Sequence, residues 1–197
     1  MIWTVIGAAV VIGGALVLLY VQYHNRIITL ENRVEEAWAQ IDVQLQKRYD
    51  LVPNLVNTVK GYATHEKDTL QAVVEARAKV GQVQVSPDTL DNPKSFQQFQ
   101  AAQSGLESAL QRLMVVVERY PDLKANQNFR DLQSQLEGTE NRIAVARRRY
   151  IEAVKTFNKA VRYFPTNLTA KYILHMEPRE TFQPEGKPIE EPPEVKF

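Results

Sequence analysis

The chain has 197 residues, a net charge of +1 and no cysteine. The balanced charge argues against a nucleic-acid-binding protein that relies on a basic surface. The absence of cysteine excludes disulfides, thiolate metal sites and cysteine nucleophiles.

The first 25 residues are predicted to be a membrane anchor. The run from Ile2 to Tyr23 carries no charge, and as a helix of about 33 Å it would match the hydrocarbon core of a bilayer. A cleaved signal peptide is the alternative interpretation, but no basic residue precedes the run and its end is a poor cleavage site. The residues assigned to the anchor include aromatic side chains at both ends, typical of membrane interfaces: Ile2, Trp3, Leu18, Tyr20 and Tyr23.

The distribution of basic residues predicts which side of the membrane holds the rest of the chain. Arg26 and Arg33 follow the run, whereas no Lys or Arg precedes it. The positive-inside rule therefore favours the cytoplasm for the bulk of the chain, although two arginines make a narrow margin.

Residues 26–165 are predicted to form an antiparallel bundle of three or four long helices, so the fold class is all-α. Apolar residues recur at alternating steps of three and four in three stripes, which run from Ile27 to Val80, from Phe96 to Tyr120 and from Phe129 to Phe164. Asn92-Pro93 is a start signal for the second stripe, and Pro165 ends the third. Long stripes joined by short connections are typical of helices that pack side by side.

Pro53 lies in the middle of the first stripe. Either the chain breaks there and a second helix starts, or one long helix continues with a kink. The apolar phase is the same on both sides, which favours the continuous, kinked helix. Because proline cannot donate a hydrogen bond to the carbonyl of Tyr49, a side chain must do so. The predicted candidates are Arg48, Asp50 and Asn54.

Residues 166–197 are predicted to be a short element followed by an extended, proline-rich tail. The tail ends in two apolar residues, Val195 and Phe197. Either they pack against the bundle, which is the favoured interpretation, or a partner captures them together with the free carboxylate.

Charged residues on the first apolar stripe are the main anomaly of the sequence. Arg48, Glu66 and Arg77 occupy positions that should face the core, where an unpaired charge is costly. The favoured interpretation is an ion-pair network that fixes helix register, with Asp50, Glu118, Glu137 and Glu140 as candidate partners. The alternative is a groove for an anionic ligand or a partner protein. The predicted polar seam, structural or partner-binding, comprises Arg48, Asp50, Pro53, Asn54, Glu66, Arg77, Glu137, Glu140 and Asn141.

No catalytic, cofactor or metal site is predicted. His65-Glu66 lacks the second histidine of a helical zinc motif, and no histidine follows a glutamate by three residues, as di-iron bundles require. The sequence also contains no glycine-rich phosphate loop and no Gly-x-Ser-x-Gly elbow.

The stretch from Gln44 to Val56, QLQKRYDLVPNLV, resembles the signature of the LemA family. Further similarities are VKGYA at 59–63 followed by His65-Glu66, Ala76-Arg77, ERYPDLKAN at 118–126 followed by Phe129, LEGTENRI at 136–143 and PEVKF at 193–197. The resemblance covers essentially the whole chain and implies a bacterial membrane protein with one N-terminal span, a helical bundle and no established enzymatic activity. The family often has asparagine at the position of Ile151, whereas Asn158 is retained here.

We therefore expect a single-pass scaffold of the bacterial envelope, anchored in the inner membrane and without catalytic activity. Its expected partners are the lipid bilayer and a membrane or envelope protein, with self-association left open and no nucleic acid or cofactor. The alternative function is a sensor or binding module for a small anionic ligand or a lipid headgroup at Arg48 and Arg77.

Overall fold

The computed structural model describes residues 2–83 and 92–182, and every regular element in these ranges is helical. This confirms the all-α class. The helices are, in chain order, α1 (Ile2–Lys60), α2 (Lys67–Gln82), α4 (Pro93–Val117), α5 (Pro121–Ala125), α6 (Gln127–Arg162) and α7 (Thr166–Tyr172).

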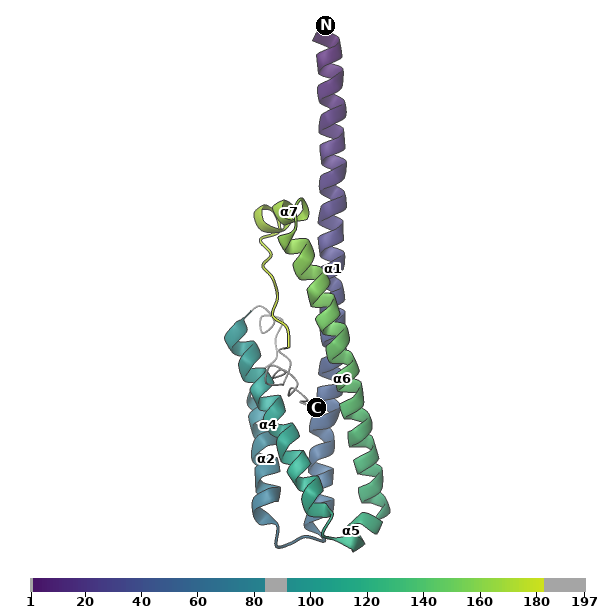
Figure 1. Cartoon of the computed structure of the whole chain (residues 1–197), viewed down its shortest axis with the longest axis vertical. Coiled ribbons are helices and arrows are strands. Elements are labelled where there is room, and N and C mark those ends of the chain that lie inside the picture. The colour runs from purple at the N-terminus through teal and green to yellow at the C-terminus, as the bar shows by residue number, and fades with distance from the viewer. Residues whose placement is uncertain (1, 84–91, 183–197) are drawn as a thin grey trace, which may run out of the picture.

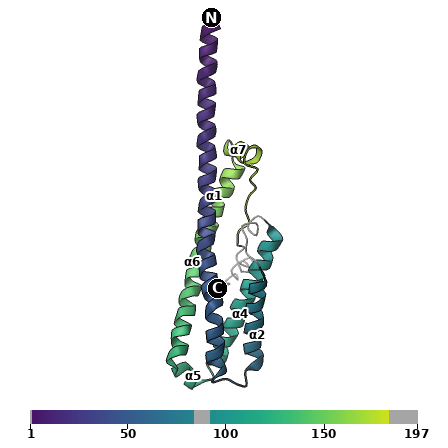
Figure 2. The same cartoon turned by 180° about the vertical axis from the view of Figure 1, so that it is seen from behind.

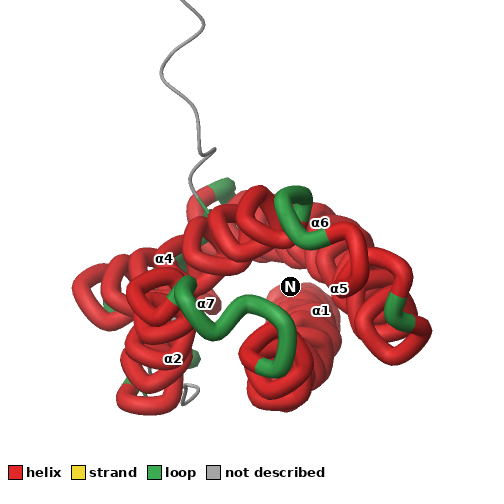
Figure 3. Tube along the Cα trace, turned by 90° about the horizontal axis from the view of Figure 1, so that it is seen from below, coloured by secondary structure: helices red, strands yellow, loops and turns green. Residues whose placement is uncertain are grey.

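The four long helices alternate in direction and form two antiparallel pairs (Figures 1 and 2). α6 runs back along the second half of α1, and α4 runs back along α2, as the end-on view also shows (Figure 3). The N-terminal part of α1, as far as Gln22, is exposed and projects beyond the bundle (Figure 1). The predicted antiparallel bundle after a free N-terminal helix is therefore confirmed.

The projecting half of α1 is long and apolar enough to cross a membrane. An 18-residue window within it has a mean hydropathy of 2.5, and none of that window is buried against the rest of the chain. Ile2, Trp3, Leu18 and Tyr20 are exposed, and Tyr23 is half-buried. An exposed apolar surface of this extent is compatible with a membrane anchor.

α1 passes through Pro53 as one helix of 59 residues. This confirms the continuous interpretation, and the alternative break at Pro53 is wrong. The first stripe is nevertheless not one helix as far as Val80, because the chain reverses over residues 61–66 and α2 begins at Lys67. The stripe keeps its phase across this turn because Ala63, within it, is buried in the same core as Val59 and Leu70.

Two hydrophobic clusters divide the bundle along its length. The cluster nearer the projecting helix includes Ile41, Leu45 and Phe99, together with residues 143–161 of α6. The cluster at the far end includes Val52, Leu106 and Leu136. Along α1 the two clusters meet between Leu45 and Val52, and the only α1 residue buried between them is Arg48.

The ends of the helices follow local sequence signals. Asn92 caps α4, since its Oδ1 accepts hydrogen bonds from the backbone N–H groups of Lys94 and Ser95, and Pro93 occupies the first turn as predicted. Residues 121–125 form the short helix α5, within the short connection between the second and third stripes. α6 ends at Arg162, just before Pro165.

The chain after α7 returns along the bundle. Residues 174–182, here called the C-terminal strap, begin with an exposed turn at His175, whose φ of 52° lies in the left-handed region. Phe182 at the end of the strap is buried in the cluster nearer the projecting helix. Val195 and Phe197, the predicted tail contacts, lie outside the described residues.

Candidate functional site

A buried polar layer separates the two hydrophobic clusters. Arg48 is 0% exposed, and its Nη1 donates to Oε1 and Oε2 of Glu140 at 3.0 and 3.2 Å. Its Nη2 donates to Oε1 of the buried Gln103. Because α1, α4 and α6 each contribute one member, a one-turn slip of any helix would leave a charge or an amide unpaired in the core. The layer therefore specifies helix register.

Arg77 satisfies the backbone carbonyl that Pro53 leaves without its helical donor. Its Nε donates to the carbonyl oxygen of Tyr49 at 3.1 Å, and its guanidinium lies 3.7 Å from the centroid of the Tyr49 ring. One turn further along α2, a Cβ on Gly81 would lie 3.0 Å from the Tyr49 hydroxyl, so a larger residue there would require the Tyr49 ring to shift slightly. The prediction that Arg48, Asp50 or Asn54 would satisfy this carbonyl is wrong, because the donor comes from the neighbouring helix.

The remaining seam residues lie apart from the polar layer. Glu66 precedes α2, and its Oε1 accepts from Nη2 of Arg119 at 3.0 Å and from the hydroxyl of Tyr120 at 3.1 Å. Burial, and then the hydrogen bond to Glu66, raise the pKa of Tyr120 above its usual value. These contacts join the α1–α2 turn to the residues that follow α4.

The other predicted members are exposed. Asp50 and Glu137 accept hydrogen bonds from Gln46 and Gln133 of their own helices, at 2.9 and 3.0 Å. Asn54 and Asn141 are also exposed. Of the four carboxylates predicted as partners for the seam arginines, only Glu140 is an ion-pair partner of one of them within the described residues.

The geometry disfavours a small-anion site at Arg48 and Arg77. Arg48 is fully buried and already faces a carboxylate, while Arg77 is committed to a carbonyl and an aromatic ring. The described residues also contain no group of three metal-ligating side chains.

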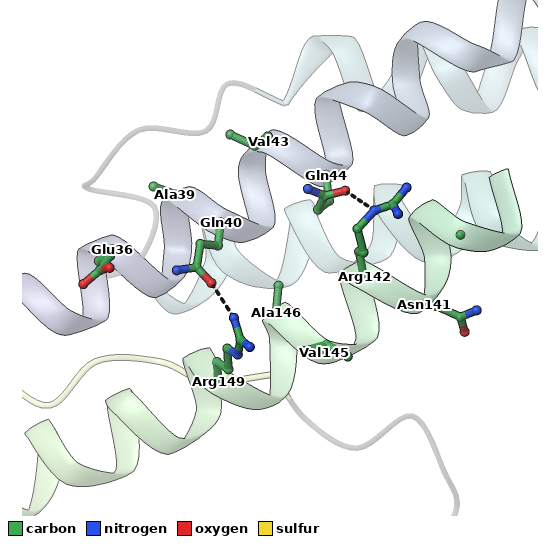
Figure 4. A pocket seen from close by; sticks show the side chains of 11 residues that line it. Glu36, Ala39, Gln40, Val43, Gln44, Asn141, Arg142, Val145, Ala146 and Arg149 are labelled. Atoms are coloured by element: carbon green, nitrogen blue, oxygen red, sulfur yellow. Dashed lines mark hydrogen bonds between the residues drawn. The ribbon is translucent and has the colours of Figure 1, made fainter. Parts of the chain in front are cut away.

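An open groove lies between α1 and α6. It has a volume of about 790 Å³, and its wall includes Ala39, Val43, Val145 and Ala146. Val43 is 64% exposed and Val145 39%. We call this feature the outer groove; its α1 and α6 side chains are drawn in Figure 4, where Asn141 points away from α1.

Two arginines span the outer groove from α6 to α1. Nε of Arg142 donates to Oε1 of Gln44 at 3.1 Å, and Nη1 of Arg149 donates to Oε1 of Gln40 at 3.3 Å (Figure 4). The acceptors are neutral amides, and the salt bridges of the described residues include neither arginine. Glu36 also lines the groove, which therefore carries two positive charges and one negative charge. An apolar wall with a net positive charge can accept an apolar and acidic surface.

Sequence reasoning missed the outer groove and the contacts of the C-terminal strap. Gln103 was visible as a polar residue at an apolar position of the second stripe, which is a usable signal for a buried partner. The outer groove gave no such signal, because it depends on how far α1 and α6 separate.

Together these features define a class: an all-helical bundle protein with a long apolar N-terminal helix and a buried polar layer. The chain belongs to the LemA family, whose model matches residues 37–197. It is also similar to Protein LemA of Metamycoplasma hominis, with 23% identity over 160 residues that cover 81% of this chain and 69% of the relative. The family match includes the polar layer, Pro53 and Arg77, whereas the apolar N-terminal segment lies outside it.

The contact between Arg77 and the Tyr49 carbonyl predicts a specific coupling with Pro53. Arg77→Met should destabilise the detergent-solubilised chain by about 1–2 kcal/mol, because a partly buried carbonyl loses its donor. In a Pro53→Ala background the same change should cost about 1 kcal/mol less, since the backbone N–H that alanine restores can take over the hydrogen bond. Urea unfolding followed by circular dichroism measures the cycle, and equal costs in both backgrounds would contradict the assignment.

The polar layer predicts an asymmetry between two ways of removing it. Glu140→Leu should lower the free energy of unfolding by about 3 kcal/mol, because it leaves the Arg48 guanidinium buried without its carboxylate. Replacing the interior pair together, as Arg48→Met with Gln103→Leu, should cost less, since the Glu140 side chain is 34% exposed and can be hydrated. The same unfolding assay compares them, and a larger cost for the double variant would refute this account of the layer.

Proposed function

We propose that this chain is a single-pass, membrane-anchored scaffold that docks another protein on its helical bundle. The observation that carries the proposal is that α1 both projects as an apolar helix and forms one wall of the outer groove. A continuous helix rises about 1.5 Å per residue, so the groove would begin about 20 Å from Tyr23, where the apolar run ends. The scaffold thus holds its docking surface at a set height above the bilayer.

The partner that fits the outer groove is an amphipathic helix with acidic residues. Arg142 and Arg149 lie two helical turns apart, so a helix with two carboxylates at heptad spacing can meet both. The exposed Val43 and Val145 would contact the apolar face of such a helix. We assign this helix to a membrane or envelope protein, because the anchor confines the groove to the vicinity of the bilayer.

The proposal is binding without catalysis. The buried Arg48 and Gln103 are engaged with each other and Arg48 with Glu140, and Arg77 is engaged with the Tyr49 carbonyl, so these groups serve helix register and helix continuity. The arginines that follow the apolar segment support an inner-membrane location with the bundle on the cytoplasmic side.

The membrane anchor predicts the behaviour of two variants on cell fractionation. The full-length chain should stay in the membrane fraction after alkaline carbonate washing and should retain an N-terminal tag. Val11→Arg with Leu16→Arg should release most of it, because each arginine at the centre of a span costs about 3 kcal/mol. Val74→Arg, at an exposed valine of α2, is the matched control. Loss of the N-terminal tag from the mature chain would contradict a retained anchor.

The outer groove predicts a charge-dependent contact in cells. A photocrosslinking amino acid at Val43 should give a defined adduct with a partner protein. Arg142→Glu with Arg149→Glu should reduce the adduct about tenfold, because both rim charges become repulsive. Arg148→Glu is the matched control, since Arg148 is exposed and does not line the groove.

Two outcomes would overturn the groove assignment. One is an adduct that the charge reversal leaves unchanged, and the other is the absence of a protein adduct. An adduct with a second copy of this chain would mean that the outer groove serves self-association and not the binding of another protein.

A further inference from the structure

The bundle holds the backbone of the C-terminal strap as a binding protein holds an extended peptide. Nδ2 of Asn158 donates to the carbonyl oxygen of Arg179 at 2.9 Å, and the backbone N–H of Arg179 donates to Oδ1 of Asn158 at 2.9 Å. The Tyr150 hydroxyl donates to the carbonyl oxygen of Glu180, also at 2.9 Å. These three hydrogen bonds involve only the backbone of the strap, so they do not depend on its side chains.

The Arg179 side chain occupies an acidic pocket. Its Nη2 lies 3.0 Å from Oε1 of Glu31 and 3.7 Å from Oε1 of Glu35, both on α1. Its guanidinium lies 5.5 Å from the centroid of the Phe157 ring on α6. The Arg179 side chain is only 10% exposed, so this pocket selects a cation.

The Phe182 side chain occupies an aromatic pocket three residues further on. Its ring centroid lies 5.1 Å from that of Phe96, 5.7 Å from that of Tyr150 and 6.3 Å from that of Trp38. These three rings come from α4, α6 and α1, so the pocket is built by the bundle and filled by the strap. An aromatic side chain is the group that fits best among rings at these separations.

The start of the strap is tied to α7 by two backbone hydrogen bonds, from the N–H groups of Leu174 and Met176 to the carbonyl oxygens of Thr169 and Ala170, each at 3.0 Å. Glu177 and Pro178 are exposed, and Leu174 and Met176 are only partly buried. The turn at its start places the exposed His175 at a positive φ, which is unfavourable for a residue other than glycine. Beyond this attachment to α7, residues 179–182 are held by the three backbone hydrogen bonds and the two pockets.

We propose that the part of the bundle that holds the strap is a peptide-binding site. It binds extended segments with the pattern Arg-x-x-aromatic, and the strap is its resident ligand. Three bonds to the backbone give affinity for any extended peptide, while the acidic and aromatic pockets give specificity for the two side chains. A partner segment of this pattern displaces the strap, so binding is controlled by competition within the chain. The site shares no residue with the outer groove and does not depend on the docking proposed there.

Tryptophan fluorescence of the full-length chain in nanodiscs can test the site directly. Trp3→Phe leaves Trp38, which lies against Phe182, as the single tryptophan. Adding Arg179→Ala with Phe182→Ala should vacate both pockets and shift the Trp38 emission to longer wavelength. A synthetic peptide of residues 174–182, LHMEPRETF, should then bind saturably and restore the original emission.

Three controls decide whether the binding is that of the proposed site. A peptide with alanine in place of its arginine and phenylalanine should bind at least tenfold more weakly. Asn158→Ala in the chain should weaken the binding of the parent peptide to a similar extent. The chain with an intact strap should also bind that peptide at least tenfold more weakly, because its own segment competes.

Two results would overturn the proposal: absence of saturable binding to the vacated chain, and equal binding of the parent and alanine peptides. If circular dichroism shows that the double variant has lost its helices, Arg179→Ala alone tests the acidic pocket, since Phe182 then stays in the aromatic cluster. Binding is in that case followed by the anisotropy of a labelled peptide, and equal binding of the parent peptide and of a peptide with alanine in place of its arginine alone would overturn the proposal.

Discussion

The hydrogen bond between Arg77 and the Tyr49 carbonyl is the contact on which the architecture depends. Proline within a helix leaves a carbonyl without its donor and normally kinks or ends the helix. Here α2 supplies the donor, and its guanidinium also lies over the Tyr49 ring. α1 therefore continues from its apolar N-terminal half to Lys60, and both hydrophobic clusters are built along one helix. The contact also fixes α2 against α1, so helix continuity and bundle assembly are coupled.

The polar layer and the Tyr49 contact lie a few residues apart on α1 and have different structural roles. Arg48, Gln103 and Glu140 specify how α1, α4 and α6 align, because any slip would bury an unpaired group. Arg77 specifies that α1 remains helical beyond them. A chain with only hydrophobic residues at these positions could pack in several registers, and it would give no reason for α1 to pass Pro53 rather than stop there.

Local sequence signals predicted the helices, and the tertiary contacts lay beyond them. The unbroken apolar phase around Pro53 gave the continuous helix, and Asn92-Pro93 gave the start of α4. Phase could not reveal the reversal over residues 61–66, because Ala63 in that turn packs in the same core as the helices on either side. Charge on the stripe identified Arg48 and Arg77, but pairing either with its acceptor requires knowing which helices are neighbours. The roles of Tyr150 and Asn158 depend on the return of the strap, which no periodicity encodes.

One continuous helix links the apolar N-terminal segment to a bundle that carries the outer groove and the strap, the two proposed binding surfaces. The claim that this helix is unbroken can be tested with spin labels at Thr29 and Asn57, two exposed positions on either side of the polar layer and Pro53, in this cysteine-free chain. Pulsed electron paramagnetic resonance should give one narrow distance distribution centred at about 42 Å, the length of a continuous helix between the two labels. A broad or clearly shorter distribution in the full-length protein would mean that α1 breaks at Pro53 and would contradict the account.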